Sequence, residues 1–342
     1  MVQRRVLIHI VTWNSEDTIA RCIEHASSQQ GFILGENLTI RITDNSSTDE
    51  TARRVESLGN RQGLEFHRND KNLGFSGAHN QGAAQCLRGG FDAMLVLNPD
   101  VGLSPTCLSE MCGALSDGER KGIVTPKLMR AGDDLSALAS RTIDAAGMIL
   151  TSALRHFDRG SGEVDSGMYE RSEEVFGATG ACLLISRACI EGISLSARVS
   201  DEAVWRIYPD LKKGAGERVR LFDEAFFAYR EDADLSWRAG RSGWRCVYVP
   251  TAIANHVRVV TPERRAQLPA LLNRLSVRNR FLLQLNNWDF SCGLASFFFG
   301  IVLRNLMVLA GVVLKEPSSI PGLLEAVQLA PRARSIYRST KR

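Results

Sequence analysis

The sequence predicts an α/β fold with a parallel sheet, followed by a helical C-terminal region. Short apolar runs alternate with segments of helical periodicity over the first hundred residues, polar motifs follow these runs, and a basic, partly apolar segment ends the chain. The composition, 342 residues with 44% hydrophobic and 23% charged side chains, is typical of a globular protein. The chain is long enough for one large domain with an appendage, or for two domains.

The first hundred residues give the alternating pattern in order. Residues 6–11 (VLIHIV) predict a buried strand and residues 18–27 (TIARCIEHAS) a helix. Residues 38–44 (LTIRITD) predict a second strand, and the following NSSTDET can cap a helix that begins near Asp49. After residue 64, LEFHRN predicts a third strand, QGAAQCL a helix and FDAMLVLN a fourth strand. Ligands of such sheets bind at the carboxyl ends of strands, where Asp44 and residues 98–100 are expected.

The rest of the chain is less regular. Residues 120–175 are polar, with several glycines between 147 and 167, so we expect a loop-rich connection across one face. Regular structure is expected to return at 177–187 (GATGACLLISR) and 244–256 (WRCVYVPTAIANH). Between them, residues 191–220 form a charged, poorly patterned insertion.

Several classes of protein are disfavoured by what the sequence lacks. The eight cysteines are scattered, no CxxC occurs, and no Cys/His spacing fits a structural zinc site. The apolar run after Arg4 and Arg5 is too short for a signal peptide, so free thiols in a reducing cytoplasm are expected. No GxGxxG follows the first predicted strand, which argues against a dehydrogenase.

The C-terminal region is basic and contains a long apolar stretch. Residues 257–342 hold 13 Lys/Arg against 4 Asp/Glu, a net charge of +9, whereas the remaining residues hold 29 against 34. Residues 294–314 (LASFFFGIVLRNLMVLAGVVL) are long enough to span a bilayer, but Arg304 and Asn305 lie in the middle. On a helix the polar and small residues of this stretch form one stripe, which favours a helix lying in the membrane interface. A buried helix packed on the body is the alternative, and nucleic acid is not an expected partner, because the basic residues flank an apolar block.

The fourth predicted strand ends in a distinctive motif, in MLVLNPDVGL at residues 94–103. Turn chemistry alone can explain Asn98-Pro99-Asp100. An enzyme that uses a nucleotide-sugar would need more: a carboxylate for base or ribose, a divalent cation on the diphosphate, and a base for the acceptor hydroxyl. Asp44 and Asp100 suit the first two roles. A dense group of acids interleaved with aromatic residues, in LFDEAFFAYREDADLSWRAG at 221–240, could supply the third.

These motifs together resemble a known family. NSSTDET, NLGFSGAHNQG (72–82), LVLNPDV, GATGACLLISR and FDEAFFAYREDADLSWR occur in the order found in inverting glycosyltransferases of family 2, and are most similar to the bacterial rhamnosyltransferase-like branch. The resemblance covers roughly residues 5–256 and implies a GT-A fold, with a Rossmann-like nucleotide-binding half. We therefore expect a catalytic domain over 1–256, and a basic, partly apolar helical region over 257–342 that is associated with the membrane.

The resemblance also implies roles for individual residues. Those expected to bind the nucleotide-sugar are Thr12, Trp13, Asp44, Asn72, Asn80, Asn98 and Asp100, with Gly74 and Gly77 allowing close backbone approach. Asp232 corresponds to the catalytic base, and Glu231 is expected to bind the acceptor or fix the loop. Asp100 and His256 are expected to hold Mg²⁺ or Mn²⁺. Asn98 stands where many relatives have the first acid of Asp-x-Asp, so one metal contact is expected to be weaker or indirect.

The expected activity is inverting transfer of a sugar in cell-wall or surface polysaccharide synthesis. The leading donor is dTDP-rhamnose, and the acceptor is expected to be a lipid-linked glycan at the cytoplasmic face of the cell membrane. One alternative is a related transferase that uses a UDP-sugar, such as galactofuranose or a hexose. Another is a non-catalytic nucleotide-sugar-binding scaffold, which the acids at 44, 100 and 232 disfavour.

Overall fold

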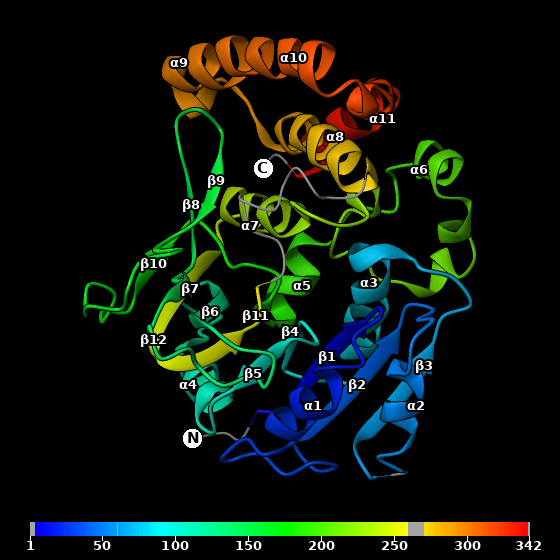
Figure 1. The fold of residues 1–342 in the computed structure, drawn as a ribbon. Helices are drawn as coiled ribbons and strands as arrows, with labels where there is room; N and C mark the ends of the chain where they lie inside the picture. Colours follow the sequence, from blue (N-terminus) through cyan, green and yellow to red (C-terminus); the bar gives the residue numbers. More distant parts are fainter. Residues whose placement is uncertain (1–3, 60, 259–269, 341–342) are drawn as a thin grey trace.

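A computed structural model describes residues 4–59, 61–258 and 270–340 and contains one large sheet (Figure 1). Its strands run in the order β10-β12-β6-β11-β4-β1-β2-β3, with β5 paired to β12 and β7 to β6. A separate hairpin is formed by β8 and β9. The strands are β1 (Val6–Thr12), β2 (Leu38–Asp44), β3 (Leu64–Arg68), β4 (Ala93–Leu97), β5 (Val101–Leu103), β6 (Lys121–Arg130), β7 (Ile143–Ala145), β8 (Met148–Leu150), β9 (His156–Asp158), β10 (Glu173–Val175), β11 (Cys182–Ser186) and β12 (Arg245–His256).

Helices cover both faces of the sheet and extend beyond it. The α-helices are α1 (Ile19–Ser27), α2 (Thr51–Glu56), α3 (Gly74–Arg88), α4 (Cys107–Ala114), α5 (Arg187–Ile193), α6 (Glu202–Ile207), α7 (Glu231–Arg241), α8 (Ala270–Asn287), α9 (Gly293–Ala295), α10 (Arg304–Lys315) and α11 (Ile320–Thr340). A π-helical stretch, Ser296–Leu303, joins α9 to α10. Short 3-10 turns occupy Pro209–Lys212, Ala215–Glu217, Glu224–Phe226, Phe290–Cys292 and Pro317–Ser319.

The first four strands confirm the predicted parallel arrangement. β1 pairs in parallel with β2 and β4, and β2 with β3. Alternation along β1 places Val6, Ile8 and Ile10 in the core beneath α1 and α4, and Leu7 in the core on the opposite face. This double burial explains why the sequence of β1 is almost continuously apolar. The carboxyl ends of these strands therefore meet at one edge.

The second half of the sheet mixes strand directions. β11 runs antiparallel to β4, so residues just before Cys182 lie beside the end of β4. β5 runs antiparallel to β12 and pairs Val101 with His256. As a result, the chain after β4, the start of β11 and the end of β12 reach the same edge of the sheet.

The prediction of a loop-rich connection over 120–175 was wrong for its first part. Lys121–Arg130 forms β6, a buried strand between β12 and β11. Pro126 and Lys127 interrupt its apolar pattern and hide the strand in the sequence. Lys127 is nevertheless buried, because its ammonium group pairs with Asp165 at 3.2 Å and with Glu170 at 2.5 Å.

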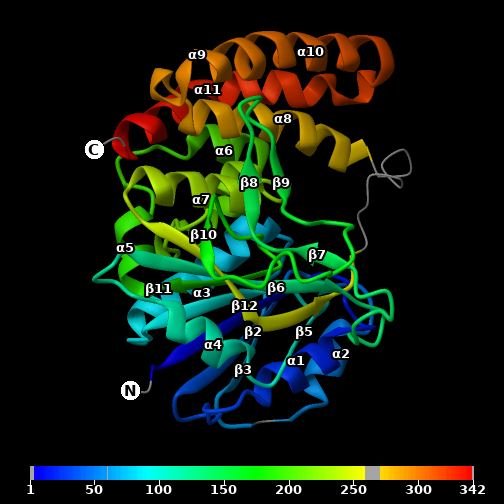
Figure 2. The ribbon, with the colours of Figure 1, turned by 90° about the vertical axis from the view of Figure 1, so that its left-hand side faces the viewer.

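The C-terminal helices form a layer beyond the sheet. α8 and α11 pack on α7 and the loops before it, while α9 and α10 run along the far side (Figures 1 and 2). Leu282 and Leu283 of α8 and Leu329 of α11 share an apolar cluster with Phe226 and Trp237. This region thus packs directly on the segment that carries the predicted base, although a division of the chain at residue 256 stays a prediction.

The helical rod Phe290–Lys315, which we call the outer helix, turns its apolar side away from the protein. By length and composition alone, it is long and apolar enough to cross a membrane. Ser296 and Gly300 face the body, whereas the large exposed apolar side chains are Phe290, Leu294, Phe298, Phe299, Leu303, Leu306, Met307, Leu309, Val313 and Leu314. The alternative of a buried helix is therefore wrong for this stretch.

Candidate active site

Asp44 anchors the end of β2 inside a hydrogen-bond network. Its buried carboxylate accepts bonds from Thr12 Oγ1 at 3.0 Å and from the backbone N–H of Ser47 at 3.1 Å, and the Ser47 hydroxyl also donates to it. Arg68 Nε lies 3.3 Å from Oδ2. The carboxylate thereby ties together the ends of β1, β2 and β3. Next to Thr12, the Trp13 side chain is 58% exposed and offers a flat apolar surface at this edge.

The predicted amide residues have different surroundings. Asn72 Oδ1 accepts from the backbone N–H of Gly74 at 2.8 Å, at the start of α3. Asn80 is buried, and its amide bonds the backbone N–H and carbonyl of Phe222 at 2.8 and 2.9 Å and Glu224 Oε1 at 3.1 Å. These bonds make Asn80 a link between α3 and the loop before α7. Protein groups thus already bond both the nitrogen and the oxygen of the Asn80 amide, and contact of this amide with a nucleotide-sugar stays a prediction.

The two predicted glycines make close approaches to protein groups. Gly74 has φ +71°, and a Cβ there would lie 2.4 Å from the carbonyl oxygen of Phe227. A Cβ at Gly77 would lie 2.7 Å from Leu211 Cδ2. Both glycines thus allow α3 to pack against the loops before α7, and a close approach to a nucleotide-sugar stays a prediction.

Asp100 and His256 are adjacent, as the metal-site prediction requires. Asn98 N–H donates to the carbonyl oxygen of Ala181 at 2.9 Å and fixes the end of β4 beside β11. The Val257 N–H donates to the carbonyl oxygen of Asp100 at 3.1 Å, which brings the end of β12 alongside. His256 Nε2 lies 3.5 Å from Asp100 Oδ1, and His256 Nδ1 lies 2.7 Å from Asp144 Oδ2.

The donor atoms at this point suit a divalent cation. Asp100 Oδ1 is buried, and its 3.5 Å contact with His256 Nε2 is longer than an ordinary hydrogen bond. A neighbouring carboxylate holds Nδ1 of the imidazole, as in many histidine metal ligands. No cluster of three His, Cys, Asp or Glu side chains that could hold a metal occurs in the part of the chain that the structure describes. Mg²⁺ and Mn²⁺ sites commonly use one or two protein ligands and complete their coordination with substrate phosphates. Asp100 and the neutral form of His256, whose Nε2 proton the ion would displace, therefore fit such an ion.

The electrostatics at His256 favour a positive charge between two carboxylates. Burial lowers the pKa of His256, but its contacts with Asp100 and Asp144 outweigh burial and raise the pKa to about 10. Arg258 extends this network, since its guanidinium lies 2.9 Å from Asp144 Oδ1 and 2.6 Å from Asp158 Oδ2. Alternating charges thus connect Asp100 with Asp158 on β9.

Asp232 lies at the first turn of α7, facing the start of β11. Its Oδ2 accepts a 3.0 Å bond from Gly180 N–H, and its Oδ1 accepts from Ala233 N–H. Burial raises the pKa of Asp232, and the charge of Asp158 raises it further. The glycine matters here, because a Cβ at Gly180 would lie 2.9 Å from Phe75 Cζ and 3.6 Å from Asp232 Cβ. A carboxylate with a raised pKa at this edge has the chemistry of a general base.

Glu231 differs from its neighbour. It is buried, and its Oε2 has no hydrogen-bond partner within the described residues. Burial, followed by the charges of Asp232 and Asp234, raises the pKa of Glu231 well above its ordinary value. Glu231 therefore holds its proton to a higher pH than a surface glutamate and can donate a hydrogen bond.

The loop before α7 has an unusual backbone. Phe227, Tyr229 and Arg230 have φ values of +62°, +69° and +72°, a conformation that L-residues with large side chains rarely adopt. Two residues of α8 hold it: Arg278 Nη2 donates to the carbonyl oxygen of Phe226 at 2.9 Å, and Asn279 Nδ2 donates to those of Phe226, Ala228 and Tyr229. The C-terminal helices thus help to place Asp232.

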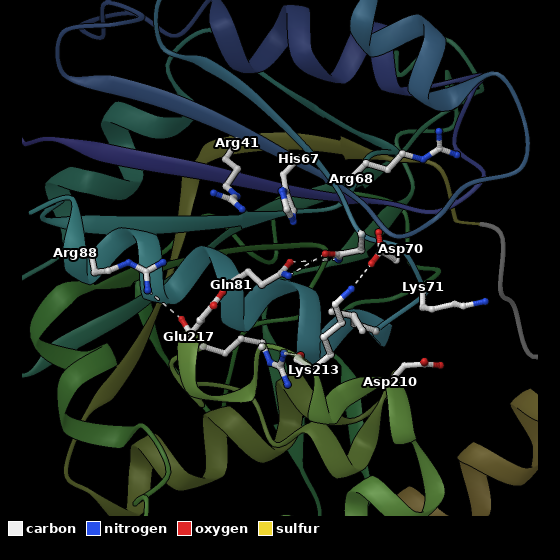
Figure 3. Close-up of a pocket in the computed structure, with 14 residues that line it drawn as sticks. Arg41, His67, Arg68, Asp70, Lys71, Gln81, Arg88, Asp210, Lys213 and Glu217 are labelled. Atoms are coloured by element: carbon white, nitrogen blue, oxygen red, sulfur yellow. Dashed lines mark hydrogen bonds and ion pairs between the residues drawn. The ribbon is translucent and has the colours of Figure 1, made fainter.

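A basic cavity of about 300 Å³ lies next to the Asp44 network, between β3, α3 and the 210–218 segment (Figure 3). Arg68 and Asn69 line it and also contact Asp44, through the ion pair above and through a 2.9 Å bond from Asn69 N–H to the Asp44 carbonyl oxygen. On the opposite wall Lys213 pairs with Asp70 (Figure 3). The cavity borders the predicted nucleotide side without containing Asp100, His256 or Asp232.

Sequence reasoning missed several residues of this site. Asp144 and Asp158 lie in the segment predicted to be loop, and Asn279 lies beyond the resemblance. The one usable signal for Asp144 was its place between Ile143 and Ala145, which are both buried in β7. Nothing local marks Asn279, because its role depends on a contact across 50 residues of sequence.

Comparison with known proteins decides the family. Residues 7–191, more than half of the chain, match the family described as Glycosyl transferase family 2. The chain belongs to glycosyl transferase family 2. The resemblance inferred from the motifs is confirmed.

One curated relative of this family-2 chain is the N-acetylglucosaminyl-diphospho-decaprenol L-rhamnosyltransferase of Mycobacterium tuberculosis, from strains CDC 1551/Oshkosh and ATCC 25618/H37Rv. This chain and the relative are 29% identical over 235 residues, which cover 64% of this chain and 66% of the relative. The match thus spans slightly less than two thirds of the relative's length.

Solved structures confirm the GT-A type of fold. TarS 1–349 of S. aureus in complex with UDP-GlcNAc has a TM-score of 0.55 at 15% identity, over 98% of this chain and 90% of that one. GalNAc-T7 with UDP, GalNAc and Mn²⁺ has a TM-score of 0.61 at 11% identity, over 99% and 59%. The Pyrobaculum calidifontis mannosyltransferase PcManGT with GDP-Man and Mn²⁺ has a TM-score of 0.50 at 14% identity, over 97% and 76%. Because the sequence identities are only 11–15%, this structural similarity shows the fold alone.

Proposed function

We propose that this family-2 protein transfers rhamnose from dTDP-rhamnose, with inversion, onto a lipid-linked glycan acceptor in cell-wall or surface polysaccharide synthesis. The observation that carries the proposal is the position of Asp232, a carboxylate with a raised pKa at the edge where β4, β11 and β12 bring Asp100 and His256 together. The mycobacterial relative, named as a rhamnosyltransferase with a diphospho-decaprenol acceptor, supports this choice of donor and acceptor.

The donor would bind along the ends of β1, β2 and β4. In this proposal Trp13 packs on the base, and the Asp44 network holds Thr12 and Arg68 in place to bind base and ribose. Asn72 and Asn98 would contact the sugar nucleotide. For Asn80 we propose an indirect role, since its amide is used to position the Phe222 segment.

Asp100 and His256 would hold a divalent cation, Mg²⁺ or Mn²⁺. When bound, the ion neutralises charge on the diphosphate leaving group. Mn²⁺ in the GalNAc-T7 and PcManGT structures supports a cation of this class. Asp144 orients His256 through Nδ1, and Arg258 and Asp158 support Asp144.

Asp232 would take the proton of the acceptor hydroxyl while that oxygen attacks the anomeric carbon, and the bond to the diphosphate breaks in the same displacement. No covalent intermediate forms, so the configuration inverts. Glu231, which keeps its proton to higher pH, would donate a hydrogen bond to the acceptor. The non-catalytic scaffold finds no support in a site that retains the acids at 44, 100 and 232.

The outer helix would bind the cytoplasmic face of the cell membrane. Its exposed side is apolar, and the C-terminal region carries a net charge of +9, which suits an anionic membrane surface. The lipid-linked acceptor of the mycobacterial relative supports a membrane location. The region after residue 256 would thus both hold the loop that precedes Asp232 and attach the protein to the membrane.

A transfer assay with a panel of donors tests the proposal. The purified chain would be offered dTDP-rhamnose, UDP-galactofuranose, UDP-glucose and UDP-GlcNAc with a short prenyl-diphospho-GlcNAc acceptor, with Mn²⁺ or with EDTA. The proposal requires metal-dependent transfer from dTDP-rhamnose in preference to the others. Preferred transfer from a UDP-sugar would establish the alternative donor, and absence of transfer from any donor would favour the scaffold.

A further inference from the structure

Four arginines from four separate segments lie close to one another near the start of α7, the helix that carries the predicted base Asp232. Arg155 lies at the tip of the β8–β9 hairpin, Arg230 immediately precedes α7, Arg280 is on α8, and Arg304 begins α10. The hairpin extends to the C-terminal helices in both ribbon views (Figures 1 and 2), and Leu154 packs against Gly300 there. We call these four residues the arginine cluster.

Contacts and charge effects show that the members of the arginine cluster are neighbours. Arg230 Nη1 lies 3.4 Å from His156 Nδ1. Burial lowers the pKa of His156 to about 3, and the charges of Arg230, Arg155 and Arg280 add to this effect. Burial likewise lowers the pKa of Arg280 to about 10, assisted by Arg230, Arg304 and Arg155. His156 is therefore a neutral group within a field of positive charge.

Three members of the cluster have no carboxylate partner among the described residues. Arg280 is only 6% exposed, its Nε donates to Asn305 Oδ1 at 3.2 Å, and its Nη2 has no partner in the described part of the chain. Arg304 Nε is also buried without a partner there. Across the described residues, Arg155, Arg280 and Arg304 make no ion pair with a carboxylate.

Other buried arginines of the same protein show that this is unusual. Each has a carboxylate partner: Arg238 pairs with Asp234 at 2.8 Å, Arg278 with Glu325 at 3.2 Å, Arg218 with Glu224 at 2.7 Å and Arg332 with Asp201 at 2.6 Å. Burying an unpaired guanidinium is costly, because no interaction offsets its lost hydration. Arg280, and Arg304 through its buried Nε, therefore have the character of a site whose counter-charge comes from a ligand.

The cluster lies next to the catalytic acids. Arg230 is two residues before Asp232. On β9, His156 and Asp158 are also two residues apart, so their side chains point to the same face at a spacing of roughly 7 Å. His156 contacts Arg230, whereas the charge of Asp158 acts on Asp232. An anion held by the cluster would thus be about one sugar's length from the base.

We propose that the arginine cluster binds the diphosphate of the lipid-linked acceptor. The inference rests on the proposed function and extends it by assigning a site to the part of the acceptor that links sugar to lipid. Guanidinium groups bind phosphate oxygens in bidentate fashion.

The position of Arg304 supports an acceptor that continues into a membrane. This residue interrupts the apolar outer helix, flanked by the exposed Leu303, Leu306 and Met307. A diphosphate held by Arg280 and Arg304 leaves its sugar directed to Asp232 and its hydrocarbon chain along the apolar side of the outer helix. This gives a function to the arginine in the middle of an apolar stretch, because Arg304 would bind the diphosphate at the point where the hydrocarbon chain of the acceptor begins.

The experiment compares Arg280→Gln with Arg171→Gln, an exposed arginine that serves as the matched control. Each full-length protein is titrated with farnesyl diphosphate in EDTA, which removes metal-dependent binding. Transfer is then measured with prenyl-diphospho-GlcNAc and with octyl-GlcNAc, which lacks the diphosphate. Melting temperature monitors folding, and removal of an unpaired buried charge should leave it unchanged or raise it.

The proposal requires at least tenfold weaker farnesyl diphosphate binding by Arg280→Gln, and a similar rise in KM for the diphosphate acceptor alone. The donor Kd and the Arg171→Gln values should match wild type. Equal binding of farnesyl diphosphate by wild type and Arg280→Gln would overturn it. If Arg280→Gln instead lost binding only to phosphatidylglycerol vesicles, the cluster would bind phospholipid headgroups and the proposal would be wrong. Because the titration needs no turnover, it gives its result even if the proposed transfer reaction fails.

Discussion

The side-chain amide of Asn279, on α8, donates a 2.8 Å hydrogen bond to the carbonyl oxygen of Tyr229, three residues before the predicted base Asp232. The same amide also bonds the carbonyl oxygens of Phe226 and Ala228. Tyr229 and Arg230 both have positive φ, so this backbone needs outside support to persist. A residue far along the chain thus holds the loop from which α7 begins.

Asn279→Ala should lower turnover at least tenfold, because the loop would relax and Asp232 would lose its orientation. Removing one partner of buried carbonyl groups should also reduce the free energy of unfolding by about 1–3 kcal/mol. Steady-state kinetics and denaturant unfolding check both effects. Asn273→Ala, on the same helix, should change neither, and a donor Kd altered as much as turnover would contradict a role confined to this loop.

The pH dependence of transfer should show the raised pKa of Asp232. A protonated carboxyl cannot accept the acceptor's proton, so kcat/KM should fall as the pH drops through this pKa, at a pH above the ordinary aspartate value of 3.8. Asp158→Asn removes a charge that raises this pKa, so the acid limb should move to lower pH. Asp133→Asn, on the exposed surface, should leave the profile in place. An acid limb that does not move in Asp158→Asn would refute the assignment.

Asp44→Asn should weaken donor binding indirectly by about 1.5–3 kcal/mol, because the network that holds Thr12 and Arg68 loses hydrogen bonds to a charged group. The amide cannot accept from Thr12 and Ser47 and also pair with Arg68, so the ends of β1, β2 and β3 would separate. Calorimetric titration with the nucleoside diphosphate measures the loss. Asp70→Asn breaks only an exposed ion pair with Lys213 and should bind the nucleotide like wild type. An unchanged Kd in Asp44→Asn would remove this residue from the nucleotide site.

The outer helix should bind anionic vesicles, and a charge on its apolar side should release the protein. Leu306→Glu with Met307→Glu places two carboxylates at exposed positions, so folding should persist while co-sedimentation falls and becomes more sensitive to salt. Met168→Glu, at a more exposed apolar site on the body, is the control. Retention of the double variant on the vesicles would contradict membrane binding by this helix.

The parallel half of the fold could be predicted because its signals are local. Strands such as Val6–Thr12 and Ala93–Leu97 are buried on both faces, so their sequences are almost entirely apolar. β6 escaped prediction because Lys127 is buried through ion pairs with Asp165 and Glu170, which no local pattern announces. The outer helix was predicted as a helix with a polar stripe, but only the structure shows that Ser296 and Gly300 on this stripe face the protein.

The candidate site divides in the same way. The sequence predicted the positions of three site residues from their motifs. Asp100 and His256 lie at the ends of predicted strands and Asp232 lies in the acidic motif at 221–240, and the order of these motifs along the chain carried the resemblance. Asp144, Asp158 and Asn279 act through contacts with His256, Arg258 and the Tyr229 loop, which join segments more than 40 residues apart. Such partners depend on how β9, β12 and α8 pack, and packing is a property of the whole chain.

The most direct measurement is the initial rate of sugar transfer by Asp232→Asn, with donor binding measured on the same protein. Asparagine keeps the shape of the side chain and removes its basicity. If Asp232 is the base, the rate should fall about 10²-fold or more while the donor Kd stays near the wild-type value. A rate within a factor of about three of wild type would be far too small a loss for a general base and would contradict the account.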